Sequence, residues 1–590
     1  MKREAFSFLS TPWCTRVFSV GLLTLCLLYP ATTIAQPTVD WVKAFISNDY
    51  NAGVDIAIDI NDDILVAGIY RDEIAFEGNP NYRFANQGKN DIVLTKIAAT
   101  GDVLWMKTIA GVGDDRAYRI ATDAQGHFYL TGSFERVLRF EENDETHTLE
   151  STGKENAFLA KFDTDGNILW SVQAGGDRSD RGIGLAIDAD GNVFTSGYFE
   201  GEAIFGTENP IHLKSNGQLD AYLAKYNTSG ALVWARALGA EKRDIASGIT
   251  VDAAGRVFIT GVTRGPTPIL DIDSNLIHGG PTGQDDLFIA RYSSSGELEK
   301  LIYAGGRGFD AGNAITADEA GNIYVTGYFE NQAAFVDLTG QRRILDGQSF
   351  DLFVSKFDAM GKMAWTQTAG GEHWDNAYDI DVDENGEVFI TGLFRKEADF
   401  TGNSEVDIEG IGEANAFIAR YTGNGDLAGV QPVKGAKSEG AGIAISKKGD
   451  VFLTGLFLQE ATFGENQKSV TSTAFNSFVA KYASNGFNEE DPEDTLQRLS
   501  EDAPLFATAQ NYPNPFTSST SFEVELQESS FIRLVIHDAL GRVIDEIVNQ
   551  EMGSGIYQFL YDAGNLARGT YFYTLETPES SITRSMTYIE

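Results

Sequence analysis

Cysteine is almost absent from this chain, and its absence limits the chemistry available. Cys14 and Cys26 are the only two cysteines in 590 residues. Both lie in residues 1–35, which have a positively charged start, an apolar stretch and small residues before Gln36, as in a secretory signal peptide. A mature chain beginning at Gln36 would have no thiol, no disulfide and no cysteine ligand for a metal.

Basic residues are also scarce. The chain has 45 Lys and Arg against 85 Asp and Glu, which gives a formal net charge of −40. A field of this sign repels nucleic acids and anionic membrane surfaces, so we expect no nucleic-acid partner. The apolar stretch of the signal is shorter than the roughly 20 residues of a membrane span, so no transmembrane segment is expected in the mature chain. We predict no cofactor, although this acidity would permit Ca²⁺ sites.

Motifs that mark familiar catalytic sites are missing. The sequence has no Gly-x-Ser-x-Gly elbow, no His-Glu-x-x-His and no Gly-rich phosphate loop, and its six histidines are scattered. The sequence therefore identifies no catalytic residue and leaves enzymatic activity open, with a non-catalytic role favoured over an enzymatic one. The many carboxylates still leave open a pair of the kind that glycoside hydrolases use.

What the chain does have is a repeat of about 65 residues that runs through it seven times. One landmark is Gly-x-x-x-Trp, as in Gly101 to Trp105 and Gly361 to Trp365. Another is Thr-Gly-x-Phe, as in Thr131 to Phe134. Repeats of this kind indicate propellers, solenoids or arrays.

Each repeat has the pattern of four short strands. In one unit these are residues 184–188, 192–199, 221–226 and 232–236, with tight turns after the first and third strands and a long polar loop after the second. The Asp-x-x-Gly turns also resemble pieces of Ca²⁺ loops, but they lack the twelfth-position Glu and the flanking helices of an EF-hand. Four strands per unit without helical periodicity predict an all-β propeller.

The chain ends predict how the ring closes. The last repeat loses its pattern after Gly486 without a fourth strand, and a matching strand stands at 39–45. We therefore expect residues 36–486 to form a seven-bladed β-propeller in which the N-terminal strand completes the last blade and removes a free edge. A linear array of small sandwiches is the alternative.

Two segments carry a resemblance to a known repeat family. They are Asp188-Ala-Asp-Gly-Asn-Val-Phe-Thr-Ser-Gly-Tyr-Phe199 and Asp318-Glu-Ala-Gly-Asn-Ile-Tyr-Val-Thr-Gly-Tyr-Phe329. Residues 38–486 resemble the bacterial SBBP-repeat propellers. That resemblance implies a seven-bladed fold and does not specify a function, because propellers host both binding and catalysis.

After an acidic linker at 487–507, residues 508–590 have a different β pattern, which predicts a small β-sandwich. Asn511-Tyr-Pro-Asn-Pro-Phe516, Leu534 to Val543 and Leu566 to Tyr573 are its landmarks. This segment resembles the C-terminal sorting domain of type A cargo of the type IX secretion system. The resemblance implies a Bacteroidota-type source, the type IX machinery as a partner, and secretion or outer-membrane surface display after signal-peptide export to the periplasm.

Residues that recur in every repeat are expected to serve the scaffold. A basic residue holds one equivalent third-strand position throughout, and we expect it to pair with repeat carboxylates; the recurrent tryptophans should pack between blades. The basic residues are Lys96, Lys161, Lys225, Arg291, Lys356, Arg420 and Lys481.

Binding residues are expected where the repeats differ, in the loops that link successive blades and in the long loops, 200–219, 264–285 and 330–350 among them. Aromatics beside Arg in these interblade loops suit sugars or peptides. The predicted function is a secreted or cell-surface recognition module for an extracellular glycan or protein. A carbohydrate-active hydrolase or lyase with carboxylates near the channel, and a structural envelope or matrix protein, are the alternatives. The candidate ligand-binding residues are Tyr50, Arg116, Arg178, Arg243, Arg307, Phe309, His373 and Trp374.

Overall fold

The computed structural model divides into two compact units, Met1–Phe487 and Asn488–Glu590. It describes residues 38–142, 145–264, 284–337, 339–402, 407–464 and 468–483 of the first unit. In the second unit it describes 506–508, 511, 516–526, 530–538, 542–553, 555–564, 566–577 and 581–589. The predicted signal segment 1–35 and nearly all of the linker lie outside these ranges. Every regular element within them is a β-strand, so they contain no helix that could cross a membrane.

Groups of four antiparallel strands build the first unit. In one group, β2 (Asn51–Ile58), β3 (Ile64–Tyr70), β6 (Asp91–Ile97) and β7 (Val103–Gly111) pair in chain order. The same order recurs in β8 (Arg116–Thr122), β9 (Phe128–Phe134), β12 (Asn156–Phe162), β13 (Ile168–Gly175); β14 (Arg181–Ile187), β15 (Val193–Phe199), β18 (Asp220–Tyr226), β19 (Leu232–Leu238); and β20 (Asp244–Val251), β21 (Val257–Thr263), β22 (Asp286–Tyr292), β23 (Leu298–Gly306).

The remaining groups continue this order and then return to the start of the chain. They comprise β24 (Ala311–Ala317), β25 (Ile323–Val336), β26 (Arg342–Phe357) and β27 (Met363–Ala369), followed by β28 (Asn376–Val382), β29 (Val388–Phe394), β32 (Asn415–Tyr421) and β33 (Leu427–Ile445). The second part of β33 begins the last group, with β34 (Val451–Phe463), β35 (Lys468–Tyr482) and β1 (Val39–Ile46). The N-terminal strand β1 thus pairs with β35, as the sequence predicts.

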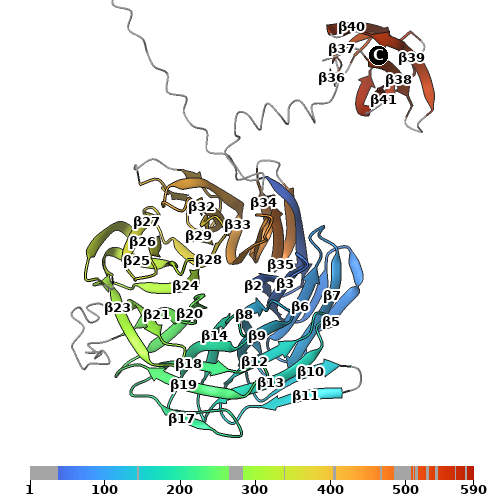
Figure 1. Ribbon diagram of the computed structural model, residues 1–590. Helices are drawn as coiled ribbons and strands as arrows, with labels where there is room; N and C mark the ends of the chain where they lie inside the picture. The colour runs from blue at the N-terminus through green and yellow to red at the C-terminus, as the bar shows by residue number, and fades with distance from the viewer. Residues whose placement is uncertain are drawn as a thin grey trace, which may run out of the picture. The chain divides into compact units, whose positions relative to one another are not determined.

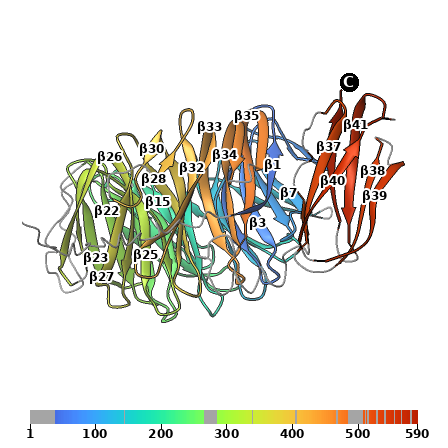
Figure 2. The ribbon, with the colours of Figure 1, turned by 90° about the horizontal axis from the view of Figure 1, so that it is seen from above.

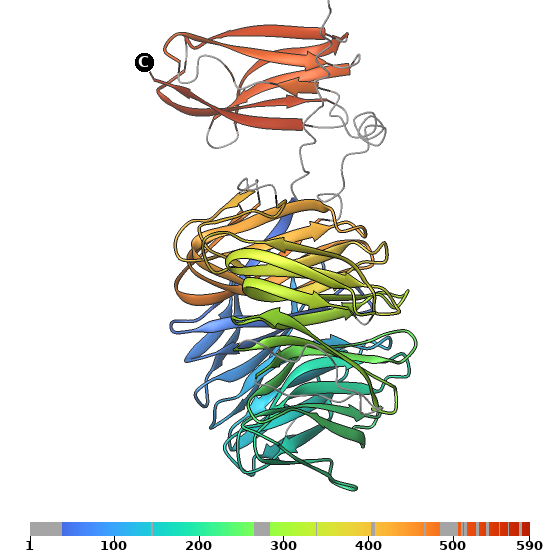
Figure 3. The ribbon, with the colours of Figure 1, turned by 90° about the vertical axis from the view of Figure 1, so that its left-hand side faces the viewer.

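The first strands of successive groups lie side by side and form a closed series. They run in the order β2, β8, β14, β20, β24, β28 and β33, and β33 contacts β2 (Figure 1). Their side chains surround a central channel of about 390 Å³. The other views show the strands of this unit running between its two faces (Figures 2 and 3). The observed architecture is an all-β, propeller-like ring.

One of these faces, which we call the turn face, carries the short turns after the first and third strands. Asp188 shows how such a turn closes: its Oδ1 accepts the N–H groups of Asp190 at 3.1 Å and Asn192 at 2.8 Å. Gly191 follows with φ of +78°, a conformation that glycine adopts without strain. The Asp-x-x-Gly segments are therefore tight turns, as predicted.

Tryptophans pack neighbouring groups together on the turn face. A Cβ added to Gly101 would lie 3.1 Å from the ring of Trp41, whose Nε1 donates to the carbonyl of Ala99 at 3.0 Å. Because glycine lets the ring approach the next turn this closely, the Gly-x-x-x-Trp spacing couples adjacent groups. The predicted packing role is confirmed. The same bond recurs from Trp170 to Thr228, Trp234 to Ser294 and Trp365 to Gly423.

The recurrent basic residues largely behave as predicted. Five of them form an ion pair with a carboxylate in the turn that follows the first strand of a group, or with the residue just after that turn. The pairs are Lys96 with Asp59, Lys161 with Asp123, Lys225 with Asp188, Arg420 with Glu387 and Lys481 with Asp450. Arg291 instead pairs with Glu299 at 2.9 Å. Lys356 departs further, because its Nζ donates to the carbonyl of Gly423 at 3.1 Å and lies over the ring of Tyr324.

The prediction of long polar loops after the second strands is wrong for 200–219 and 330–350. Both segments form β-hairpins whose first strand pairs with the outer strand of the preceding group, which covers that edge. Ala203 and Phe205 show the reason, since they alternate with exposed residues and are buried. Most of 264–285 lies outside the described residues. The hairpin strands are β4 (Glu73–Phe76), β5 (Asn79–Ala85), β10 (Val137–Glu142), β11 (Glu145–Glu150), β16 (Glu202–Phe205), β17 (Ile211–Lys214) and the outer parts of β25 and β26; a shorter pair is β30 (Glu397–Ala398) with β31 (Ile408–Glu409).

The second unit contains two antiparallel sheets that share one apolar core. One sheet has β36 (Phe506–Thr508), β37 (Ser519–Leu526) and β40 (Gly555–Asp562). The other has β39 (Val543–Met552), β38 (Ser530–His537), β41 (Gly569–Glu576) and β42 (Ser581–Tyr588). Phe522 from the first sheet and Leu534 and Tyr573 from the second are fully buried in a common cluster.

Candidate functional site

The opposite face of the ring, which we call the loop face, carries the connections between successive groups. Each connection lies beside the third strand of the preceding group. Its neighbour there is the residue just before that strand or, in the long strands β26 and β35, the equivalent residue within the strand. We call this contact a junction. Bridges of this kind join Tyr50 to Phe475, Asn90 to Asp114, Glu155 to Ser179, Leu219 to Arg243 and Asp285 to Phe309. The backbone is shared, whereas the side chains differ from one junction to the next.

A buried Asp holds the backbone of most junctions in place. Asp375 Oδ2 accepts the N–H of Gly371 at 2.9 Å and its Oδ1 accepts the backbone N–H of Arg395 at 2.9 Å. Burial raises the pKa of Asp375 to about 8 and that of Asp180 to about 7. Asn51 and Ser438 take this position in two groups, so a neutral side chain also fits. This position belongs to the scaffold.

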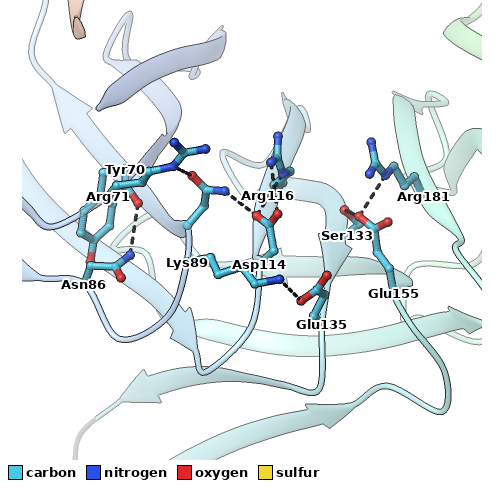
Figure 4. A network of polar contacts seen from close by, with 11 residues as sticks. Tyr70, Arg71, Asn86, Lys89, Asp114, Arg116, Ser133, Glu135, Glu155 and Arg181 are labelled. Carbon is cyan, nitrogen blue, oxygen red and sulfur yellow. Dashed lines mark hydrogen bonds and ion pairs between the residues drawn. The ribbon is translucent and has the colours of Figure 1, made fainter. Parts of the chain in front are cut away.

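Ion pairs and hydrogen bonds fill one part of the loop face (Figure 4). Arg71 Nε donates to Asn90 Oδ1 at 2.8 Å, and Arg116 donates to both carboxylate oxygens of Asp114 at 3.0 and 3.1 Å. The predicted residue Arg116 is thus neutralised within the protein. Further pairs are Lys89 with Glu135 at 2.8 Å and Arg181 with Glu155 at 2.9 Å.

Aromatic rings gather in another part of the loop face. Phe350 stacks with Phe309 at 6.4 Å between centroids and meets Trp374 edge-on, also at 6.4 Å. The Cζ of Arg395 lies 5.2 Å from the ring centroid of Trp374, which is 38% exposed. Phe350 therefore brings the predicted residues Phe309 and Trp374 together. Sequence reasoning missed Phe350 because it lies within β26 rather than in an interblade loop.

The other predicted residues are distributed around the same face. Tyr50 lies against Phe475, with ring centroids 6.3 Å apart. Arg178 is exposed and pairs with Glu200 at 2.7 Å, and Arg243 pairs with Asp285. These residues do not converge on one pocket. Arg307 lines a hollow of about 920 Å³ beside the hairpin of β25 and β26, and His373 is half-buried next to Trp374 in the chain.

The central channel holds a buried ion-pair cluster that the sequence did not single out. Arg119 on β8 lies 3.1 Å from Asp55 on β2 and 3.1 Å from Asp379 on β28. The two carboxylates are only 4% and 8% exposed, and they also accept the backbone N–H groups of Ile120 and Ile443. Burial raises the pKa of the Asp55 carboxyl, and the neighbouring Arg119 opposes that rise. Because β8 and β28 are not neighbours, Arg119 links groups across the channel.

No three His, Cys, Asp or Glu side chains in the described part of the chain are grouped so that they could hold a metal ion.

Comparison with known proteins identifies the second unit. Residues 510–588 match the family described as the secretion system C-terminal sorting domain. The chain carries a type IX sorting domain. The sorting domain directs export to the cell surface or secretion, which confirms the prediction made from Asn511–Phe516 and the segments that follow it.

The other similarities are distant. An uncharacterized WD repeat-containing protein of Acanthamoeba polyphaga mimivirus is 20% identical over 420 residues, covering 60% of this chain and 30% of that protein. The regulatory protein FlaEY of Caulobacter vibrioides is 20% identical over 412 residues, covering 66% and 41% respectively. The chain thus spans less than half the length of these two relatives. PorZ of Porphyromonas gingivalis, a surface component of the type-IX secretion system, aligns with a TM-score of 0.24 and 12% identity over 91% of this chain and 81% of that one.

Proposed function

We propose that the first unit is a seven-bladed β-propeller that acts as a non-catalytic recognition module for an extracellular glycan or protein. Residues 36–486 supply the propeller, the strand at β1 completes its last blade, and the sorting domain forms a small β-sandwich. The chain is exported after removal of residues 1–35 and engages the type IX machinery through its C-terminal unit. The order of first strands, closed by the contact of β33 with β2, supports the blade count.

The aromatic part of the loop face carries the functional proposal. Trp374 is exposed, and Phe309 and Phe350 are half-buried beside it. Large aromatic side chains left accessible next to arginines are the residues that dominate recognition surfaces, because they bury much area and keep polar groups at their edge. The tryptophans of the turn face instead pack between neighbouring groups.

The channel supports a binding function over catalysis. A carboxylate pair for glycoside hydrolysis needs one group free to exchange a proton with substrate or water. Asp55 and Asp379 are both held by Arg119 and by backbone N–H groups. Asp381, which also lines the channel, accepts backbone N–H groups from Val382 and Ile445.

The proposal is tested with the purified chain beginning at residue 36, incubated with immobilised polysaccharides and extracellular proteins. Retained protein and released product are both measured, with Ca²⁺ and with EDTA. We expect saturable retention without product, and its loss in Trp374→Ala. Product release that depends on Asp379 would establish the enzymatic alternative. Envelope association without any retained ligand would favour a structural role.

A further inference from the structure

Two junctions of the loop face share one arrangement of three side chains, which we call a stack. In the first stack, Phe475 lies 6.3 Å from Tyr50, and the Cζ of Arg71 lies 5.2 Å from the Tyr50 ring centroid. In the second, Phe350 lies 6.4 Å from Trp374, and the Cζ of Arg395 lies 5.2 Å from the Trp374 ring centroid. Both stacks join a Phe within a long third strand (Phe350 in β26, Phe475 in β35), an aromatic in the connecting loop and an Arg that follows a second strand.

A third arginine, Arg264, has a carboxylate partner that the arginines of the two stacks lack. Arg264 also follows a second strand, and its Cζ lies 5.7 Å from the ring centroid of Phe309. There the residue that precedes the third strand is Asp285, which accepts a hydrogen bond from Arg264 Nε at 2.7 Å and also pairs with Arg243. Asp285 takes the position that Phe350 and Phe475 hold in the stacks. Arg264 is neutralised by its own protein.

Arg71 and Arg395 have no such partner. Neither forms an ion pair with a carboxylate among the described residues, although the chain has nearly twice as many acidic as basic residues. Arg395 Nε is buried and makes no hydrogen bond within the described part of the chain, and Arg71 Nε donates only to the neutral amide of Asn90. Both guanidinium groups therefore carry a charge that no carboxylate of the described residues neutralises through an ion pair, beside aromatic rings on the loop face.

The nearby carboxyl of Asp375 does not fill this role. It receives the backbone N–H of Arg395 at 2.9 Å and that of Gly371, and it is fully buried. Burial raises its pKa to about 8, so it is largely protonated at neutral pH and leaves the guanidinium charge uncompensated.

We propose that the two stacks bind anionic groups, uronate carboxylates or sulfate esters, of an extracellular polysaccharide. The planar guanidinium of each stack receives one anionic group in a two-point contact, and the neighbouring Tyr50 or Trp374 contacts the sugar ring. A polymer with regularly repeated charges can occupy both stacks, which lie on the same face with one other junction between them. This inference rests on the proposed recognition function and gives its ligand a chemical class.

Because the protein is strongly acidic, we expect a polyanion to need contacts with both stacks in order to bind. A net charge of −40 repels a polyanion at long range, so affinity has to come from short-range contacts at the arginines. Two contacts on one polymer reinforce each other because the second forms at a high effective concentration. Removing either guanidinium should therefore weaken binding strongly.

The test uses the purified chain from residue 36 and three probes: dextran sulfate, polygalacturonate and neutral dextran. Binding is measured by titration calorimetry for the wild type, Arg71→Gln, Arg395→Gln and the double variant. Arg83→Gln is the matched control, because Arg83 loses the same charge from an exposed pair with Glu73 on an outer hairpin. Thermal unfolding of each variant confirms that it is folded.

We expect one or both polyanions to bind and dextran not to bind. Each single variant should bind about tenfold or more weakly, the loss typical of one charge-assisted contact, and Arg83→Gln should match the wild type. Preference for dextran sulfate identifies sulfate as the ligand group, and preference for polygalacturonate identifies carboxylate. The inference is overturned if neither polyanion binds, if dextran binds equally, or if the stack variants behave like Arg83→Gln. Retention of a neutral glycan or a protein would then leave the recognition function intact.

Discussion

The turn face and the loop face of the ring are built on the same repeat but use it differently. On the turn face, the same residue types meet in successive groups: tryptophan on glycine, and a basic residue on a turn carboxylate. On the loop face, the equivalent backbone bridges carry Tyr and Phe, Asn and Asp, or Leu and Arg. The contrast shows that a repeat protein can fix its fold at one end and vary its chemistry at the other.

The largest loss of stability is expected from a substitution in the central channel, between the turn face and the loop face. Arg119→Met leaves Asp55 and Asp379 buried without a cation, so it should lower the free energy of unfolding by about 4 kcal/mol. Chemical denaturation measures this loss. The control is Arg136→Met, since Arg136 is exposed and forms no ion pair with the residues that the structure describes, so its replacement should change stability little. Equal stability of the two variants would show that the channel cluster does not hold the ring together.

Replacing one tryptophan on each face tests whether the turn face serves stability and the loop face serves ligand binding. Trp365 on the turn face is 8% exposed and donates to Gly423, so Trp365→Ala should cost about 3 kcal/mol of stability. Trp374 on the loop face is 38% exposed, so Trp374→Ala should cost less than about 1 kcal/mol and abolish ligand retention. If Trp374→Ala unfolds the protein as readily as Trp365→Ala, the two faces do not divide stability from function.

A smaller loss of stability is expected when the recurrent basic residue of one third strand is replaced. Lys225 lies 3.4 Å from Asp188 and over the ring of Phe194, so Lys225→Met should lower the melting temperature by an amount that corresponds to about 1–2 kcal/mol. Lys214→Met is the matched control, because Lys214 is largely exposed and 3.9 Å from Glu202. Ligand binding should persist in both variants. Lost binding in folded Lys225→Met protein would give this position a functional role.

A pH-dependent effect on stability is expected from the buried aspartates beneath the loop face. Burial raises the pKa of Asp375 to about 8 and of Asp310 to about 7, above the ordinary value of 3.8. The folded protein then holds protons that the unfolded chain releases, so stability is highest below about pH 4 for these groups and falls as pH rises to about 8. Melting temperatures measured from pH 5 to pH 8.5 should decline. In Asp375→Asn, which imitates the natural Asn51, the decline should be shallower; an unchanged slope would contradict this assignment.

Much of the scaffold could be predicted because it depends on local, repeated signals. The tight turn at Asp188 to Gly191 and the packing of Trp365 both follow from short spacings. The pairing of β1 with β35 could be predicted because one repeat lacks a strand that the chain start supplies. The hairpin at 202–214 was missed because only Ala203 and Phe205 mark its buried side within a polar segment.

The candidate site could be predicted only in part. Tyr50, Phe309 and Trp374 were expected on the loop face because the interblade loops carry unlike residues. Phe350 was missed, because its contact with Trp374 forms only when the end of a hairpin is brought beside the next connection. Whether an arginine is neutralised likewise depends on which side chain the fold places across from it, as Asp285 shows for Arg264.

The central claim is that the loop face recognises a ligand without supporting the fold. The most direct test compares Phe350→Ala/Trp374→Ala with the wild type in two measurements on the same samples, denaturant unfolding and ligand retention. We predict an unfolding midpoint close to that of the wild type and complete loss of retention. Retention at the wild-type level in the folded double variant would contradict the claim.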